Sequence, residues 1–219
     1  MTVATLSGLA LEELHPDTRG APHEMLHVYK ENCVQCLVVS DYTKPTRYTL
    51  ETMIIYGEAE FLMSRDDQVH SYLLSAVAVR LALRMGLHRD SSKLGTHFTP
   101  FEAETRRRLW YHINQLDLLA SFHIGLPGMI QIIDSDTLPP RNLLDEDFDE
   151  DCTELPPSRP ESEMTPMSYA LCKGRLSHVA GEIMVTANKL QLPHYGVILE
   201  LDSKLREAYG KVPPATSTR

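Results

Sequence analysis

Apolar residues recur every three or four positions along most of the chain, and no stretch shows the sustained apolar–polar alternation of a half-buried strand. Residues 24–40 carry such an apolar face, made of Met25, Val28, Tyr29, Cys33, Cys36 and Leu37. A second helix is predicted over Thr49–Met63, with its buried side formed by Leu50, Met53, Ile54 and Phe61. The pattern predicts an all-α fold.

Two further helices have clear boundary signals. Residues 68–85 suit an amphipathic helix whose apolar face is Val69, Leu73, Ala76, Val77 and Leu81. Gly86 follows where a left-handed C-terminal cap is wanted, so the helix should end there. Thr99, Pro100 and Glu102 form a capping box with proline at the first helical position, and they predict a long helix that reaches about Ser121.

The long helix carries three consecutive arginines before the only tryptophan of the chain. Leu109, Ile113, Leu116 and Ala120 form its core-facing line, with Trp110 and Asp117 seven residues apart on an adjoining line. Consecutive helical residues point about 100° apart, so the arginines cannot all face one phosphate strand. We expect structural ion pairs instead, with Glu102 and Glu104 as the nearest partners of Arg106, Arg107 and Arg108.

After Gly125–Leu126–Pro127 the helical periodicity lapses into a connector rich in proline and acid, which we expect to be a solvated loop, with disorder as an alternative. Thr165–Pro166 starts a further helix, carried by Leu176, Val179, Ile183 and Leu190. A last helix is defined by Ile198, Leu201, Leu205 and Ala208. The predicted organisation is a core helical part at 1–143, the connector at 144–164, C-terminal helices of the same domain at 165–212, and a polar tail at 213–219.

The net charge of -9 resides in this connector region. Residues 134–163 hold eleven acids against two arginines, and the rest of the chain holds nineteen acids and nineteen bases. A neutral body lacks the basic excess that nucleic-acid binding requires. No secretory leader and no run of roughly 20 apolar residues is present, so we expect an intracellular, soluble chain without membrane contact.

Short matches to enzyme and metal motifs are incomplete. His88–Arg89–Asp90 begins like a kinase catalytic loop, but Gly95 stands where the magnesium-binding asparagine belongs. The spaced aspartates from Asp145 lack the glycine and glutamate of a calcium loop. Cys33 and Cys36 have no second pair to complete a zinc site, and we expect them to be core residues. No catalytic, cofactor-binding or metal-binding residue is predicted, although a helical ligand-binding protein or enzyme that uses the ten histidines stays an open alternative.

Three stretches in order resemble one family. They read AVRLALRMGLHRD (residues 78–90), FTPFEAETRRRLWYHINQLDLLASFHIGLP (residues 98–127) and DTLPPRN (residues 136–142). Together they resemble the middle homology region of fungal zinc-cluster transcription factors. The likeness is strongest from about 49 to 151.

The resemblance implies an irregular all-helical regulatory domain of a nuclear transcription factor, which acts through protein partners, a homodimer or a small-molecule effector. A separate zinc cluster would read DNA. The family-motif residues, which we expect to have scaffold roles, are Gly86, Leu87, His88, Arg89, Asp90, Glu104, Arg106, Arg107, Arg108, Leu109, Trp110, Asp117, Gly125, Pro127 and Pro139.

The chain departs from the family pattern in two ways. Leu126 replaces the arginine that commonly lies between the glycine and the proline at the end of the second stretch. The DNA-reading module needs six clustered cysteines around two zinc ions, and this chain has four cysteines in all. DNA binding and zinc are therefore expected from another module, and the chain resembles a fragment or shortened form. The alternative is a stand-alone interaction module that dimerises with a full-length factor and modulates it.

Overall fold

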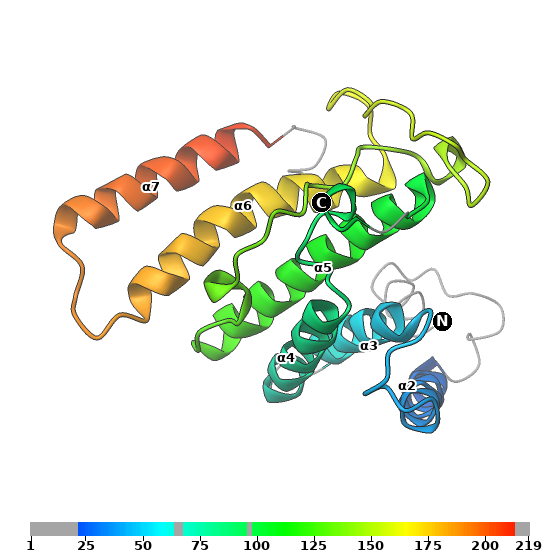
Figure 1. Ribbon diagram of the computed structural model, residues 1–219. Helices are drawn as coiled ribbons and strands as arrows, with labels where there is room; N and C mark the ends of the chain where they lie inside the picture. The colour runs from blue at the N-terminus through cyan, green and yellow to red at the C-terminus, as the bar shows by residue number, and fades with distance from the viewer. Residues whose placement is uncertain (1–21, 64–67, 96–97, 213–219) are drawn as a thin grey trace. The chain divides into compact units, whose positions relative to one another are not determined.

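The computed structural model describes residues 22–63, 68–95 and 98–212, and Figure 1 shows their helices. The helices are α2 (Pro22–Val39), α3 (Thr49–Met63), α4 (Val69–Arg84), α5 (Pro100–Ile124), α6 (Pro166–Ala187) and α7 (Tyr195–Gly210). Short 3-10 turns lie at 91–93, 130–132 and 145–147, and the described residues contain no strand. The predicted all-α class is confirmed. The chain divides into two compact units, residues 1–85 and 86–219, and the division falls at the end of α4.

In the first unit, α3 packs between α2 and α4. Leu50, Met53 and Ile54 are buried on α3 as predicted. The predicted face of α4 is wrong at two positions, because Val69 and Leu73 are exposed while Ser71 and Ser75 are buried. The serine hydroxyls are accommodated by backbone carbonyls: Ser71 Oγ lies 3.5 Å from Gly57 O, and Ser75 Oγ donates to Tyr72 O at 2.9 Å.

The buried face of α2 is rotated from the predicted one. Leu26 and Leu37 are buried, whereas Val28 is exposed. Cys33 is half-buried and Cys36 is exposed, so the expectation that both cysteines are core residues is wrong. Lys30 also turns towards α3, where its Nζ lies 2.7 Å from the buried carboxylate of Glu60. The side of α2 that faces α3 therefore includes a lysine, whose aliphatic stem packs there while its charge pairs with Glu60. Apolar spacing alone could not predict this.

The second unit is built on α5, whose start is the predicted capping box. Thr99 Oγ1 accepts from Glu102 N at 3.2 Å, and Glu102 Oε2 accepts from Thr99 N at 2.8 Å. The helix extends three residues past the predicted end, to Ile124, and Gly125 follows as the C-terminal cap with a left-handed φ of 72°. Ile113, Leu116 and Ala120 are buried as predicted, and Leu109 is half-buried.

α6 lies along α5, and α7 packs against α6 (Figure 1). The approach of α5 and α6 is very close at Gly174, where a Cβ atom would lie 1.7 Å from the Tyr111 hydroxyl oxygen. Gln115 of α5 also donates its Nε2–H to Ala170 O at 2.9 Å. Leu190 was expected to carry α6, but the helix ends at Ala187 and Leu190 is fully exposed. No residue of α7 is buried.

The acidic connector is a loop, as predicted, but hydrogen bonds and ion pairs hold it at several points, so it is not simply solvated. Buried Asn142 donates through Nδ2 to the carbonyls of Arg159, Pro160 and Glu163, at 3.1–3.4 Å. Its Oδ1 accepts from Thr165 Oγ1 at 2.6 Å and from Ser168 Oγ at 3.1 Å, so one amide joins the connector to the start of α6. The paired Arg159 guanidinium lowers the pKa of Asp147 to about 2. Hydrogen bonds of this kind give the connector a fixed path.

Candidate functional site

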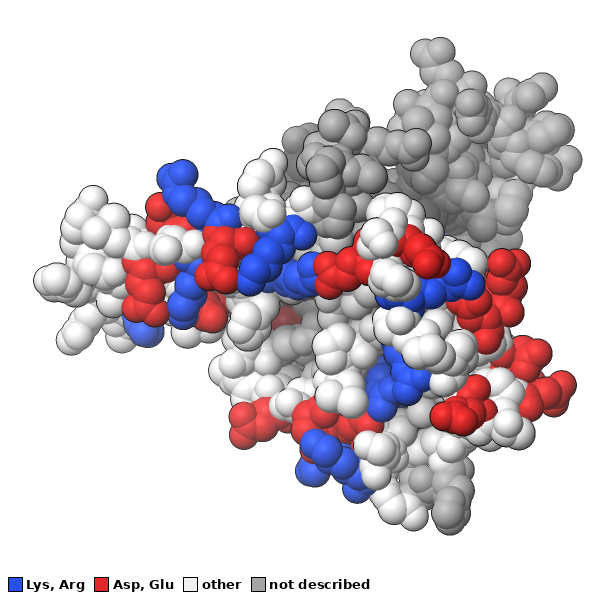
Figure 2. Space-filling model, turned by 90° about the horizontal axis from the view of Figure 1, so that it is seen from above, with Lys and Arg blue, Asp and Glu red and all other residues white. Residues whose placement is uncertain are grey.

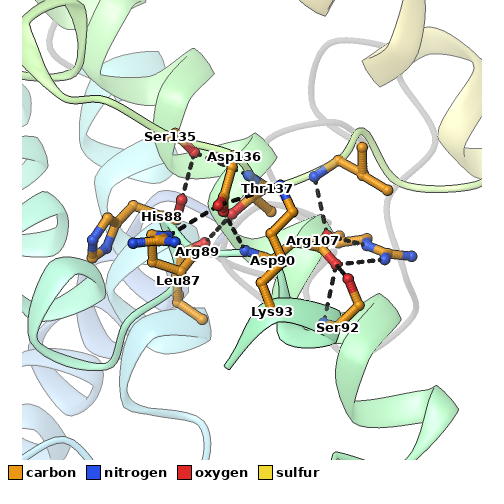
Figure 3. Close-up of polar contacts among 11 residues, drawn as sticks. Leu87, His88, Arg89, Asp90, Ser92, Lys93, Arg107, Ser135, Asp136 and Thr137 are labelled. Carbon is orange, nitrogen blue, oxygen red and sulfur yellow. Dashed lines mark hydrogen bonds and ion pairs between the residues drawn. The ribbon is translucent and has the colours of Figure 1, made fainter. Parts of the chain in front are cut away.

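Residues 86–90, which open the second unit, present their backbone carbonyls to side chains from two distant segments. Gly86 has a left-handed φ of 71°, and its carbonyl accepts from Arg106 Nη2 at 2.9 Å. The Leu87 carbonyl accepts from Thr137 Oγ1 at 2.6 Å. The His88 carbonyl accepts from Ser135 Oγ at 2.8 Å and from Asp136 N at 3.1 Å (Figure 3). We call residues 86–90, Arg106–Arg108 and Ser135–Leu138 the motif cluster.

The centre of the motif cluster is the carboxylate of Asp90, which is fully buried. It forms a two-point ion pair with Arg107: Nε donates to Oδ2 at 2.8 Å and Nη2 donates to Oδ1 at 2.9 Å. Oδ1 also accepts from the backbone N and the hydroxyl of Ser92, and Oδ2 accepts from Leu138 N at 3.1 Å (Figure 3). The Arg107 guanidinium therefore holds the pKa of Asp90 well below its ordinary value.

Asp136 supports the same turn from the outside. Its Oδ1 accepts from Asp90 N at 2.8 Å, and its Oδ2 accepts from Arg89 Nε at 3.1 Å, with Lys93 Nζ at 3.4 Å. The side chain of Arg89 is half exposed. This outer pair is therefore a weak, solvent-screened contact, whereas the bond to Asp90 N fixes the backbone.

A second fully buried carboxylate, Glu104, lies one helical turn before Arg108. Its Oε1 accepts from Arg108 Nε at 3.3 Å and from Arg141 N at 3.0 Å. Burial raises the pKa of Glu104, and the Arg141 N–H and the Arg108 charge oppose that shift. Arg108 also reaches the connector, where Nη1 lies 3.2 Å from Asp145 Oδ1 and the guanidinium lies 4.7 Å from the centre of the Phe148 ring.

Trp110 and Asp117 are both buried on α5. The Trp110 ring packs against His88, with ring centres 6.3 Å apart. Asp117 Oδ2 accepts from Ile130 N at 3.0 Å, which returns the chain across the end of α5 after Gly125 and Pro127. Gly128 is required in this return, since a Cβ atom there would lie 2.7 Å from Asp117 Oδ2. Pro139 is exposed.

The three arginines therefore go to three different places. The predicted pair of Arg108 with Glu104 is confirmed. Arg107 pairs with Asp90, and Arg106 binds the Gly86 carbonyl and stacks 4.5 Å from the centre of the Phe98 ring. Sequence reasoning missed Asp90 as the partner of Arg107, and it missed Asp136, Thr137 and Asn142. The DTLPPRN stretch that carried the family resemblance contains the last three, and it was the available signal.

The charged side chains of the motif cluster contact one another and the backbone. The Asp90 carboxylate is saturated with donors and holds its proton weakly, so it does not suit a general base. Among the described residues, no group of three or more His, Cys, Asp or Glu side chains could hold a metal ion. On the face shown in Figure 2, basic and acidic side chains lie beside one another rather than in a uniformly basic patch. None of the helices that the structure describes is both long enough and apolar enough to span a membrane.

Comparison with known proteins matches residues 37–206 to the family described as the fungal specific transcription factor domain. The chain is 43% identical over 212 residues, 97% of its length, to the Zn(2)-C6 fungal-type transcription factor pigI of Monascus ruber. It is 40% identical over 91% of its length to the Zn(2)-C6 fungal-type transcription factor mpsB of Macrophomina phaseolina. It is 38% identical over 87% of its length to the equisetin cluster transcription factor eqxF of Fusarium heterosporum.

The chain spans only 26% of the length of the Monascus protein, and 27% of each of the other two. No solved structure matches it. The family match nevertheless covers most of the chain and includes all three motif stretches and the whole motif cluster. This chain therefore belongs to the fungal specific transcription factor domain family.

Proposed function

We propose that this chain is the regulatory, middle homology domain of a zinc-cluster transcription factor, and that it controls RNA polymerase II transcription of a biosynthetic gene cluster in the nucleus. The family match over residues 37–206 carries the proposal. Relatives named as cluster transcription factors support the finer statement about biosynthetic genes. Catalysis has no part in this function, since the buried charges of the motif cluster are all used in holding the fold.

DNA would be read by a different module. The sequence has four cysteines, fewer than the six that a two-zinc cluster needs. The arginines that precede Trp110 are committed to internal partners, so they offer no phosphate-binding surface. Zinc and sequence-specific DNA contacts consequently belong to the module that reads DNA, and this chain supplies regulation.

A reporter experiment tests regulation directly. The 219-residue chain would be fused to a heterologous DNA-binding module and an activation segment in a fungal cell, with a reporter under the matching operator. We expect the fused chain to change reporter output relative to the same fusion without it, and Asp90→Asn to abolish that change. Asp136→Asn, which alters the outer ion pair, is the matched control and should keep it. An output unaffected by the chain would refute the regulatory function.

A binding experiment tests the division of labour between this chain and a DNA-reading module. The purified chain would be titrated with mixed-sequence duplex DNA at low and at physiological salt. We expect no binding at either salt, because the basic side chains near Trp110 are internally paired. Tight binding that weakens steeply with salt would mean that the chain itself contacts phosphates, and the assignment of DNA reading to another module would be wrong.

A second candidate is a stand-alone module that dimerises with a full-length factor and dampens it. Exposed apolar side chains on and before α7 favour it, among them Leu192, Ile198 and Leu199. The measurement is the molar mass of the purified chain in solution, together with a pull-down that uses a full-length relative as prey. Recovery of monomer alone, with no factor retained, would exclude this candidate and leave the first.

A further inference from the structure

A cavity of about 800 Å³ lies within the second unit between α5, α6 and residues 130–139. This volume is in the range of small-molecule sites in proteins. Its apolar lining is Trp110, Leu118, Ile130, Ile133, Leu138 and Val185. The cavity also reaches the motif cluster, because Arg107, Ser135 and Thr137 contribute to the same lining. A molecule bound here would rest against the segment that holds residues 86–90.

Two glycines of α6 differ in a way that bears on this cavity. Gly174 is demanded by packing, because a Cβ atom there would collide with Tyr111. Gly181 is not, since a Cβ atom there would meet only Gln131 Cγ, at an ordinary 3.8 Å. Glycine lowers helix stability relative to almost any other residue, so its presence at an uncrowded interior position needs another reason. Its effect here is to leave the cavity open.

Charges at the cavity wall are already neutralised. Arg107 pairs with Asp90, Arg175 pairs with Glu161, and Glu182 lies 2.8 Å from Lys204 Nζ. An ionic ligand would therefore find no unopposed charge, and its own charge would lose hydration on entry. The lining of the cavity therefore favours an uncharged ligand over an ionic one.

Neutral polar groups are available instead. The side-chain amide of Gln131 makes no hydrogen bond to any described residue. Asn114 and Gln115 each use the amide N–H on a backbone carbonyl, Trp110 O and Ala170 O respectively, which leaves the oxygen of each amide as an acceptor within the described structure. Gln115 is nearly fully buried and is one of the residues that line the cavity. Unused amide groups over an apolar wall suit hydroxyl and carbonyl substituents.

We propose that this cavity binds an uncharged, largely apolar small molecule that carries hydroxyl or carbonyl groups, and that this molecule is an effector of the domain. Its apolar body packs on Trp110 and the aliphatic wall, and its polar substituents exchange hydrogen bonds with the amides of Gln131, Gln115 and Asn114. The effector role rests on the proposed regulatory function, whereas binding itself is a property of the purified chain and is measured without a reporter.

The test uses the only tryptophan of the chain as the detector. Prodan, an uncharged naphthalene ketone that absorbs near tryptophan emission, is titrated into the full chain, and quenching of Trp110 fluorescence is followed. We expect saturable one-to-one quenching. Anilinonaphthalene sulfonate, a naphthalene of similar size with a negative charge, should bind more weakly. Quenching that does not saturate, or tighter binding of the sulfonate, would overturn the proposal.

Neighbouring variants on α6 locate the probe. Gly181→Leu places a side chain in the cavity and should weaken Prodan binding roughly tenfold or more. Ala180→Leu is the matched control: Ala180 does not line the cavity but lines a neighbouring apolar groove, which contains Phe122 and Leu205 and shares Gln115 and Leu118 with the cavity. It should leave Prodan affinity unchanged. Gly181→Leu should also keep or raise the melting temperature, since it replaces a helical glycine.

The affinities of the two α6 variants for Prodan can refute the site. Unchanged affinity in a folded Gly181→Leu, or lost affinity in Ala180→Leu alone, would place the probe outside the cavity and refute the site. Should Gly181→Leu fail to fold, Gln131→Leu provides the second measurement: it keeps the cavity but removes the unused amide, and an unchanged Prodan affinity there would contradict the proposed contact. A silent reporter with intact Prodan binding would reject the regulatory role and leave the site standing.

Discussion

Replacing Asp90 by asparagine should destabilise the protein strongly, although it only exchanges a carboxylate for an amide of the same shape. The substitution keeps the shape of the side chain but removes its charge and turns one acceptor oxygen into an NH2 donor. Each carboxylate oxygen of Asp90 faces at least two donors: Arg107 Nη2, the Ser92 backbone N and the Ser92 hydroxyl at Oδ1, and Arg107 Nε with Leu138 N at Oδ2. Whichever way the amide turns, its NH2 group opposes donors.

The magnitude follows from burial. Asp90 is fully buried and the side chain of Arg107 is only 12% exposed, so the change leaves a cation with little solvent and without its hydrogen-bonded counter-charge. Breaking a buried ion pair from one side costs about 3–5 kcal/mol. Small domains have total stabilities of about 5–15 kcal/mol, so the loss would be a large fraction of the whole.

The assay is urea unfolding followed by far-UV circular dichroism, with the free energy of unfolding extrapolated to water. Asp136→Asn is the control, because it lies on the more exposed side of the same turn and its amide oxygen can still accept from Asp90 N; its cost should stay within about 1 kcal/mol. Adding Arg107→Gln to Asp90→Asn should recover part of the loss, since the uncompensated cation is gone. A loss for Asp90→Asn below about 1 kcal/mol would refute this account of the buried pair.

The same pair predicts a pH dependence with a definite sign. Arg107 lowers the pKa of Asp90 in the folded state, so the unfolded chain takes up the proton first as the pH falls. The stabilisation is fully present above about pH 4, the unfolded value, and is lost as the pH falls through the lower folded value. Asp90→Asn should therefore flatten the acid limb of the stability curve. The raised pKa of Glu104 acts in the opposite sense, because its contribution is lost as the pH rises through the folded value.

Three further substitutions test the packing around the motif cluster. Trp110→Ala should cost about 3–5 kcal/mol in urea unfolding because it empties a buried site, and an unchanged melting temperature would rule out Trp110 as a core anchor. Gly174→Ala should cost about 1–3 kcal/mol because the Tyr111 ring must move away, and the pair with Tyr111→Leu should be milder than the sum of the two. Asn142→Ala should cost about 2–4 kcal/mol and speed proteolysis of residues 155–164, and unaltered proteolysis would show that the amide does not hold the connector.

Local signals predicted the helices well and long-range partners poorly. The capping box at Thr99, the left-handed Gly86 and the spacing of Ile113, Leu116 and Ala120 each depend on a few neighbouring residues, so the sequence alone suffices for them. The faces of α2 and α4 were misplaced because periodicity counts apolar residues, while Ser71 and Ser75 are buried through hydrogen bonds to carbonyls.

The sequence predicted most residues of the motif cluster but not which of them pair with one another. The Arg107 side chain could reach several acids, and the choice of Asp90 depends on where Gly86 turns the chain and where Leu138 returns to it. Such choices join residues 17 to 48 positions apart, which no helical spacing encodes. The family resemblance marked the right stretches without revealing which atoms meet.

The hydrogen bonds of Asn142 also determine where this chain can tolerate insertions. Asn142 N donates to Ser158 Oγ and Arg159 N donates to Asn142 O, each at 2.9 Å, so the intervening segment is closed at its base. Within it, residues 149–151, 153 and 154 are exposed. Lengthening a closed loop adds only about 0.6 kcal/mol per doubling. Insertions at this tip should therefore accumulate freely among related proteins, while the register between α5 and α6 stays constant.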